Sequence, residues 1–137
     1  MNGRKGLNSK KGLNSRETGK NYENKAVSFL EKNAFQILER NFNCRQGEID
    51  IIGIHENCLV FVEVKYRKDR RKGSPEEAVG SLKQQKICRV SDFYRVRHEE
   101  YFNRQIRYDV IGICGECEEE ITWYQNAFPY CGRQTAW

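Results

Sequence analysis

The sequence lacks any apolar run approaching the roughly 20 residues that a membrane-spanning helix needs. Its first residues are polar and basic, without the apolar segment of a secretory signal. Membrane and secreted proteins are therefore not expected, and we expect a soluble, cytoplasmic protein with no membrane partner. The 137 residues, of which 38% are hydrophobic and 31% charged, suit one compact domain.

Histidine is scarce, and the cysteines lack the paired spacing of a zinc site. The sequence has two histidines and six cysteines, and Cys114 with Cys117 forms a single C-x-x-C pair. A structural zinc site needs four ligands, so no zinc is expected. Without a secretory signal, reduced thiols are favoured over disulfides. Cys58 and Cys88 lie among apolar neighbours and are predicted to be small buried residues.

Excess positive charge is confined to the N-terminal segment. Residues 1–20 hold six basic residues and one acid, whereas the remaining chain holds 18 of each, so this segment carries the net charge of +5. A near-exact repeat, KGLNSK followed by KGLNSR, is too polar to contribute to a core. We therefore predict a disordered basic arm over residues 1–17, a single domain over 18–130 and an irregular tail over 131–137.

Hydrophobic periodicity predicts an α/β fold with a mixed sheet of four to five strands. Apolar residues at three- and four-residue steps predict two helices, over residues 19–33 and 74–97, with Gly80 separating the first turn of the second. Strands are predicted over residues 35–42, 48–54 and 58–66, and near residues 106–113 and 121–123. Residues 55–57 would form the turn of a hairpin. The order is α-β-β-β-α-β-β, with helices packed on the sheet.

Four charged residues interrupt the most strand-like stretch, GEIDIIGIHENCLVFVEVK, at residues 47–65. Side chains two apart on a strand share a face, so Glu48 lies beside Asp50, and Glu63 lies beside Lys65. If the hairpin aligns those faces, three carboxylates and an ammonium group converge. The opposite face would then carry Ile49, Ile51, Val62 and Val64.

Clustered carboxylates repel one another unless a cation lies between them. Mg²⁺ is commonly bound by one or two carboxylates and keeps several waters, which leaves room for phosphate oxygens. Such an ion lowers the pKa of bound water and stabilises charge on a phosphodiester, and a neighbouring lysine can orient or deprotonate the water. A solvated polar sheet face with a Glu–Lys pair explains the same spacing equally well. The pattern alone leaves both interpretations open.

Asp50, followed thirteen positions later by Glu63-Val64-Lys65, resembles the signature of the PD-(D/E)XK, or restriction-endonuclease-like, nuclease superfamily. More narrowly, the chain is similar to the YraN-like family of uncharacterised small bacterial proteins within that superfamily. The literal Pro-Asp dipeptide is absent, because Ile49 precedes Asp50. The matching segments, which run from residue 19 to 128, are GKNYENKA, ILERNFNCRQGEIDII, LVFVEVKYR, AVGSLKQQKI, RYDVIGI and NAF.

The resemblance implies a restriction-endonuclease-like core and metal-dependent hydrolysis of phosphodiester bonds in nucleic acid. It implies that Asp50 and Glu63 bind the metal, that Lys65 is the catalytic lysine and that Glu23 completes the site from the first helix. Mg²⁺ or Mn²⁺ would be the cofactor, and DNA is favoured over RNA as the partner. Two alternatives stay open: a non-catalytic nucleic-acid-binding module with the same fold, and a structural or partner-binding protein. A homodimer is suggested by analogy with relatives only.

Further polar residues are candidates for supporting roles. Glu48 is a candidate outer-sphere partner. Lys83 and Gln84 are candidates for a position near the metal, and a polar helix face explains them equally well. Arg107 and Asp109 share a face of the fourth strand, where a buried ion pair is expected. The candidate phosphate contacts are Arg45, Arg67, Lys68, Arg70, Arg71, Lys72 and Lys86.

Overall fold

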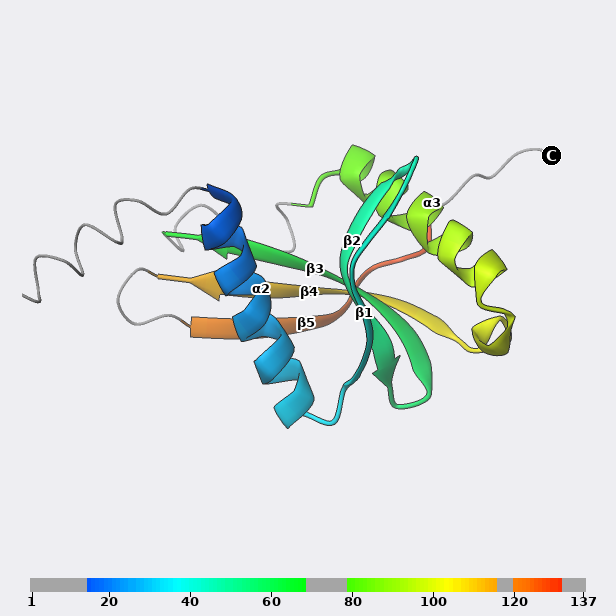
Figure 1. Cartoon of the computed structure of the whole chain (residues 1–137), viewed down its shortest axis with the longest axis horizontal. Coiled ribbons are helices and arrows are strands. Elements are labelled where there is room, and N and C mark those ends of the chain that lie inside the picture. The colour runs from blue at the N-terminus through cyan, green and yellow to red at the C-terminus, as the bar shows by residue number, and fades with distance from the viewer. Residues whose placement is uncertain (1–14, 69–78, 116–119, 132–137) are drawn as a thin grey trace, which may run out of the picture.

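The computed structural model describes residues 15–68, 79–115 and 120–131, which form one mixed sheet flanked by helices (Figure 1). The order α-β-β-β-α-β-β and the α/β class are confirmed. The elements, with the labels of Figure 1, are α2 (Ser15–Lys32), β1 (Gln36–Cys44), β2 (Gly47–His55), β3 (Cys58–Arg67), α3 (Ser81–Arg97), the 3₁₀ helix η3 (Glu99–Tyr101), β4 (Ile106–Cys114) and β5 (Glu120–Phe128).

Two helix boundaries differ from the prediction. Helix α2 begins at Ser15, four residues before the predicted start at residue 19. Gly80 is the N-cap of α3 rather than a residue within it, because its backbone is extended. The predicted start signals at residues 74–77, and residues 1–14 of the predicted arm, lie outside the described residues.

The strand order in the sheet is β1-β2-β3-β4-β5, which is also the chain order. Strands β3 and β4 are parallel, and the other neighbouring pairs are antiparallel. The β2–β3 hairpin turns on Glu56 and Asn57, whose φ angles of 50° and 66° fit the two-residue turn that matches strand twist. The parallel pair needs a long crossover, and this crossover contains α3.

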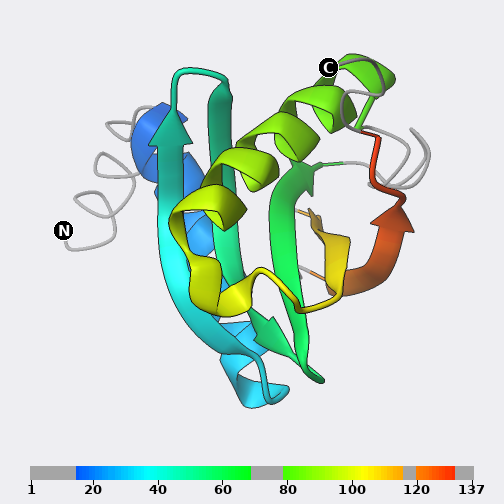
Figure 2. The same ribbon diagram turned by 90° about the vertical axis from the view of Figure 1, so that its right-hand side faces the viewer.

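The two helices cover opposite faces of the sheet, with α3 crossing in front of the strands and α2 lying behind them (Figure 2). Neither described helix combines the length and hydropathy needed to cross a membrane. The α2 face is filled by Ala26, Leu30, Phe35, Ile51, Val60, Val62, Ile111 and Ile113. The α3 face is filled chiefly by Ile49, Ile52, Leu59, Phe61, Ile87, Cys88, Val90, Tyr94, Tyr108 and Val110. Cys88 is buried as predicted, whereas Cys58 is only partly buried.

Strand β2 changes face at Asp50, which corrects one prediction. Ile49, Ile51, Val62 and Val64 were expected on a single face. Ile51, Val62 and Val64 do pack on the α2 side, but Ile49 belongs to the α3 cluster. Two residues separated by two positions can lie on opposite faces only where the regular alternation is interrupted. The interruption falls at the candidate site.

Candidate active site

The candidate site lies where strands β2 and β3 part. Their paired register runs from His55–Cys58 up to Ile51–Val62 and ends there. One position further, the Asp50 carboxylate accepts a hydrogen bond from the backbone N–H of Val64, at 2.8 Å. A side chain therefore takes the place of a backbone acceptor, and Asp50 is fixed between the two separating strands.

Asp50 and Glu63 form a carboxyl pair in which both pKa values are raised. Glu63 is 7% exposed, and burial together with the charge of Asp50 raises its pKa to about 7. Burial also raises the pKa of Asp50, opposed by the hydrogen bond from Val64. The two carboxyl groups are within hydrogen-bonding reach of each other. Two neighbouring carboxylates repel each other where water is largely excluded, so the pair retains a proton close to neutral pH.

Two ammonium groups approach Glu63 from different elements. Lys65 Nζ, from the same strand, lies 3.9 Å from Glu63 Oε2, and Lys83 Nζ, from α3, lies 3.7 Å from the same oxygen. Both distances exceed the 2.7–2.9 Å of a strong charge-assisted hydrogen bond. The lysine side chains are 35% and 43% exposed, so their ammonium groups also face water. They lower the pKa of Glu63 without neutralising the pair.

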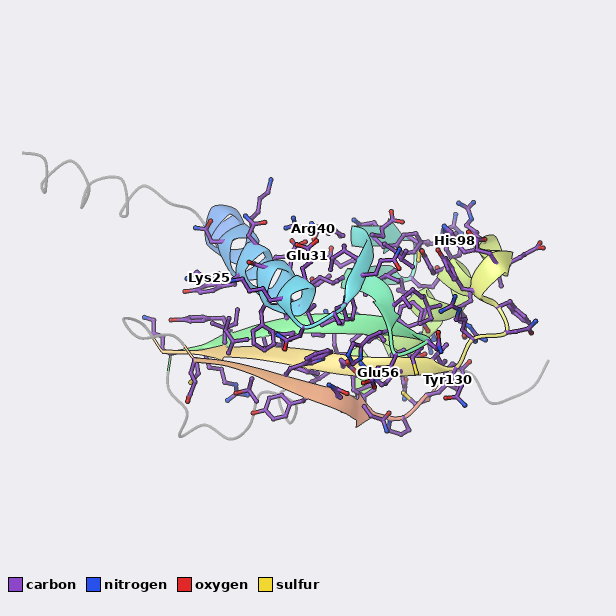
Figure 3. The ribbon with its side chains drawn as sticks, turned by 90° about the horizontal axis from the view of Figure 1, so that it is seen from below. Lys25, Glu31, Arg40, Glu56, His98 and Tyr130 are labelled. Atoms are coloured by element: carbon purple, nitrogen blue, oxygen red, sulfur yellow. The ribbon has the colours of Figure 1, made fainter. Side chains whose placement is uncertain are left out.

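Glu23, the candidate site residue on α2, is hydrogen-bonded by two residues of β1. Its carboxylate accepts hydrogen bonds from Arg40 Nε at 2.8 Å and from Asn41 Nδ2 at 2.9 and 3.1 Å. Asn41 has a φ of 52°, in the left-handed region that asparagine tolerates well. Arg40 lies on the α2 side of β1 (Figure 3). Glu23 therefore acts on the pair through its charge, which raises the pKa of Asp50.

A hollow of about 500 Å³ opens beside Asp50 on the α2 side. One of its walls is a stacked pair of rings, Tyr22 and Tyr66, with centroids 4.1 Å apart. The hollow is lined by Gly19, Lys20, Tyr22, Glu23, Asn41, Glu48, Asp50, Val64 and Tyr66. It is large enough for a nucleotide-sized group and presents three carboxylate side chains to it.

The donor set at this junction suits a hard divalent cation. Asp50 and Glu63 offer carboxylate oxygens, the ligands that Mg²⁺ and Mn²⁺ prefer, and a cation would relieve the repulsion that raises their pKa values. In the part of the chain that the structure describes, no three His, Cys, Asp or Glu side chains are grouped as metal ligands. Glu23 is turned toward Arg40 instead.

The sequence pattern of uncharacterised protein family UPF0102 matches residues 22–113, which contain the whole junction. The chain belongs to this family. A UPF0102 protein of Caldicellulosiruptor saccharolyticus is 40% identical over 116 residues, covering 82% of this chain and 98% of the relative. One from Cytophaga hutchinsonii is 44% identical over 94 residues, covering 69% and 81%. The resemblance read from the sequence is thereby confirmed.

The other candidate residues of this UPF0102 protein are spread around the junction. Exposed Glu48 lines the hollow and raises the pKa of Asp50. Gln84 is turned away, because its amide donates to the Val79 carbonyl at 2.8 Å. Of Lys83 and Gln84, Lys83 alone reaches the carboxyl pair.

The candidate phosphate contacts fall into three groups. Arg45 is exposed at the β1–β2 turn, and Lys86 is exposed on α3. Arg67 and exposed Lys68 lie at the end of β3, directly after the carboxyl pair. The remaining candidates lie outside the described residues; they are Arg70, Arg71 and Lys72.

Sequence reasoning missed two arrangements and anticipated a third. It missed the capture of Glu23 by Arg40 and Asn41, although both residues stand in the ILERNF segment that carried the resemblance. It also missed the approach of Cys131 to Cys88, with sulfur atoms 3.4 Å apart. The ion pair between Arg107 and Asp109 is buried, as predicted.

Proposed function

We propose that this UPF0102 protein hydrolyses phosphodiester bonds in nucleic acid with the help of Mg²⁺ or Mn²⁺. The observation that carries the proposal is the pair formed by buried Glu63 and partly buried Asp50, with the amines of Lys65 and Lys83 within 4 Å of one carboxylate oxygen of Glu63. A structural role alone does not account for placing two carboxyls against each other, because this arrangement costs free energy in the metal-free protein.

Each residue has a chemical role in this proposal. Asp50 and Glu63 would hold the cation, which supplies a water of lowered pKa and neutralises charge on the phosphate. Lys65 would orient that water or stabilise the developing negative charge, and partial exposure of its side chain leaves its ammonium group accessible. Lys83 would stabilise charge from the α3 side. Glu23 would support Asp50 from α2.

Nucleic acid would be bound by basic residues around the junction, with DNA favoured over RNA. Arg67 and Lys68 follow Lys65 along the same chain segment, so their cationic groups stand near phosphates that flank the scissile bond. Such contacts are independent of sequence and weaken as salt rises. Substrate structure, rather than base sequence, would then decide which molecules are cut.

The hydrogen bonds that Arg40 and Asn41 donate to Glu23 support a second candidate function. An acid that is already paired with Arg40 is less free to complete a metal site. The second candidate is therefore a nucleic-acid-binding module that has the nuclease fold and does not turn over substrate.

The decisive experiment measures cleavage and binding separately. Purified protein is incubated with plasmid, single-stranded and branched DNA and with RNA, each in Mg²⁺, Mn²⁺ or EDTA. Cleavage that requires the metal, and that falls at least about 100-fold in Asp50→Asn and Lys65→Ala, supports the nuclease. Asn keeps an oxygen that can accept from Val64, so the fold should persist in the first variant.

Matched controls come from α2. Glu31→Gln and Lys32→Ala remove one exposed charge of each sign from that helix and should leave the rate unchanged. Binding in EDTA without cleavage in any metal would favour the second candidate. Cleavage that survives in Asp50→Asn would contradict the assignment of the site.

A further inference from the structure

Helix α3 carries a strong positive charge that the candidate active site uses only in part. Its sequence contains five basic residues and one acid, Asp92, and no acid in its first turn. Asp92 accepts a hydrogen bond from the Tyr130 hydroxyl at 2.8 Å. Lys83 alone of the five cations contacts the carboxyl pair. A surface of this sign attracts a polyanion and attracts it less as salt rises.

Aromatic and apolar side chains lie among these charges. The Arg97 guanidinium group stands over the ring of Phe93, 4.8 Å from its centroid. Val96 and Tyr130 are 68% and 46% exposed, which is unusual for large apolar side chains next to one another. Together they line a hollow of about 390 Å³ with Gln46, Arg89 and Asp92. Phe93 is partly exposed and Tyr130 is exposed. Accessible rings interleaved with guanidinium groups are features that bind unpaired nucleotides, because every base offers a flat face for stacking.

Helix geometry connects this hollow to the carboxyl pair. Lys83, Lys86, Phe93 and Arg97 follow one another at steps of three, seven and four residues, which keeps them along one side of α3. Phe93 is ten residues from Lys83, or about 15 Å along the helix at 1.5 Å per residue. This distance corresponds to about four steps at the 3.4 Å rise of a strand within a DNA duplex, and to fewer steps of an extended single strand. Tyr130 lies toward the end of the molecule away from α2 (Figure 3).

We propose that the α3 surface, formed by Lys86, Arg89, Phe93, Arg97 and Tyr130, binds an unpaired stretch of nucleic acid. One base stacks in the hollow against Phe93 and Tyr130, and the cations contact the flanking phosphates. Where the proposed nuclease function holds, on which this part rests, the substrate has a single-stranded segment within about four nucleotides of the cleaved phosphate. A continuous duplex cannot use the hollow, because its bases are already stacked and face inward.

Charge argues against a second copy of this chain as the occupant. A two-fold dimer places the same patch of each copy against itself. The guanidinium groups of Arg89 and Arg97 would then face their own counterparts, and like charges repel at such an interface. A polyanion matches the surface in both charge and shape.

Binding in EDTA tests this surface without any cleavage. Fluorescence anisotropy compares three labelled DNA probes: a blunt duplex, a single strand, and a duplex with a single-stranded extension. The wild type should favour the two probes with unpaired bases. Phe93→Leu and Tyr130→Leu should weaken binding of those two probes at least about fivefold and leave the duplex affinity unchanged. Phe102→Leu, another exposed aromatic residue beyond the end of α3, is the matched control.

Two further measurements separate stacking from charge. An extension made of abasic nucleotides keeps its phosphates but has no bases, so the wild type should bind it as weakly as Phe93→Leu binds the normal probe. Arg89→Gln should reduce the slope of log affinity against log salt concentration by about one, the amount expected for the loss of one phosphate contact. Arg104→Gln should leave this slope unchanged. The abasic probe uses unaltered protein, so its result does not depend on how any variant folds.

Several results would overturn the proposal. Equal affinity for normal and abasic extensions would show that no base stacks in the hollow. The same conclusion would follow if Phe93→Leu weakened duplex binding as much as single-strand binding. A change of oligomeric state in Phe93→Leu or Tyr130→Leu would identify a second copy as the occupant. Absence of binding to all three probes would also overturn it. Cleavage in Mn²⁺ is scored separately, so preference for unpaired bases without cleavage would contradict only the nuclease function.

Discussion

Two buried carboxylate sites in this molecule are held in opposite ways. Asp109 on β4 is fully buried and accepts four short hydrogen bonds, two of them from Arg107 at 2.9 Å and the others from Trp123 Nε1 and the Asn126 backbone at 2.8 Å. Glu63 on β3 is almost as buried but faces the Asp50 carboxyl group and two ammonium groups at 3.7 and 3.9 Å.

The difference separates a carboxylate that is neutralised within the fold from a carboxyl pair that is not. A buried carboxylate with a complete set of donors is neutralised within the fold and needs no ligand. A carboxyl pair that must share a proton is relieved by anything positive that binds there. The same residue types therefore stabilise the sheet at Asp109 and, in the proposed function, would hold a cation at Asp50 and Glu63.

The largest expected effect is the loss of stability in Asp109→Asn. The substitution leaves Arg107 buried without its charge partner, and breaking such a pair costs about 3–5 kcal/mol. Asp50→Asn, by contrast, removes like-charge repulsion and should leave stability equal or higher at pH 8. Urea denaturation of both variants in EDTA measures the difference. A similar loss in the two variants would show that Asp50 is structural as well.

The order of elements could be predicted because it depends on local patterns. The alternation of side chains in β2 and β3, and the three- and four-residue spacing of apolar residues in α3, depend only on residues that are close in sequence. The approach of Asp50 to Glu63 could be predicted for the same reason, since two strands joined by the turn at Glu56 and Asn57 must bring these positions together. Their role as a site came from the family resemblance.

Features that depend on contacts between distant segments could not be predicted. Ile49 changes face at the point where Asp50 bonds to Val64 across the hairpin, which no alternation rule anticipates. Glu23 and Arg40 are seventeen residues apart and meet only through the packing of α2 on β1. The approach of Cys131 to Cys88, 43 residues apart, has the same origin.

The second prediction concerns pH and uses the raised pKa of Glu63. The pKa is about 7 in the folded protein and 4.5 in an unperturbed glutamate, so the folded state holds the proton more tightly. Its stabilising contribution is complete below pH 4.5 and is lost as pH rises to about 7, a decrease on the order of 3 kcal/mol without metal. Glu63→Gln cannot ionise and should lack this decrease.

The measurement is the melting temperature in EDTA at pH 6 and pH 8. Relative to Glu63→Gln, the wild type should lose stability at the higher pH, and Mn²⁺ should restore it in the wild type alone. Asp109→Asn, which leaves the pair intact, serves as a comparison and should keep the wild-type pH dependence. Identical pH profiles for the wild type and Glu63→Gln would show that the pair is already neutralised in the free protein.

The smallest expected effect decides to which of the two kinds of site Glu23 belongs. If Glu23 supports the cation, Glu23→Gln should weaken Mn²⁺ binding about 10- to 100-fold in calorimetry, as is usual for outer-shell partners of a metal. Arg40→Gln should strengthen Mn²⁺ binding, because it frees the Glu23 carboxylate to act on Asp50. If Glu23 instead resembles Asp109, both variants lose stability and neither changes metal affinity. Opposite shifts in affinity are therefore the outcome that separates a supporting acid from a structural one.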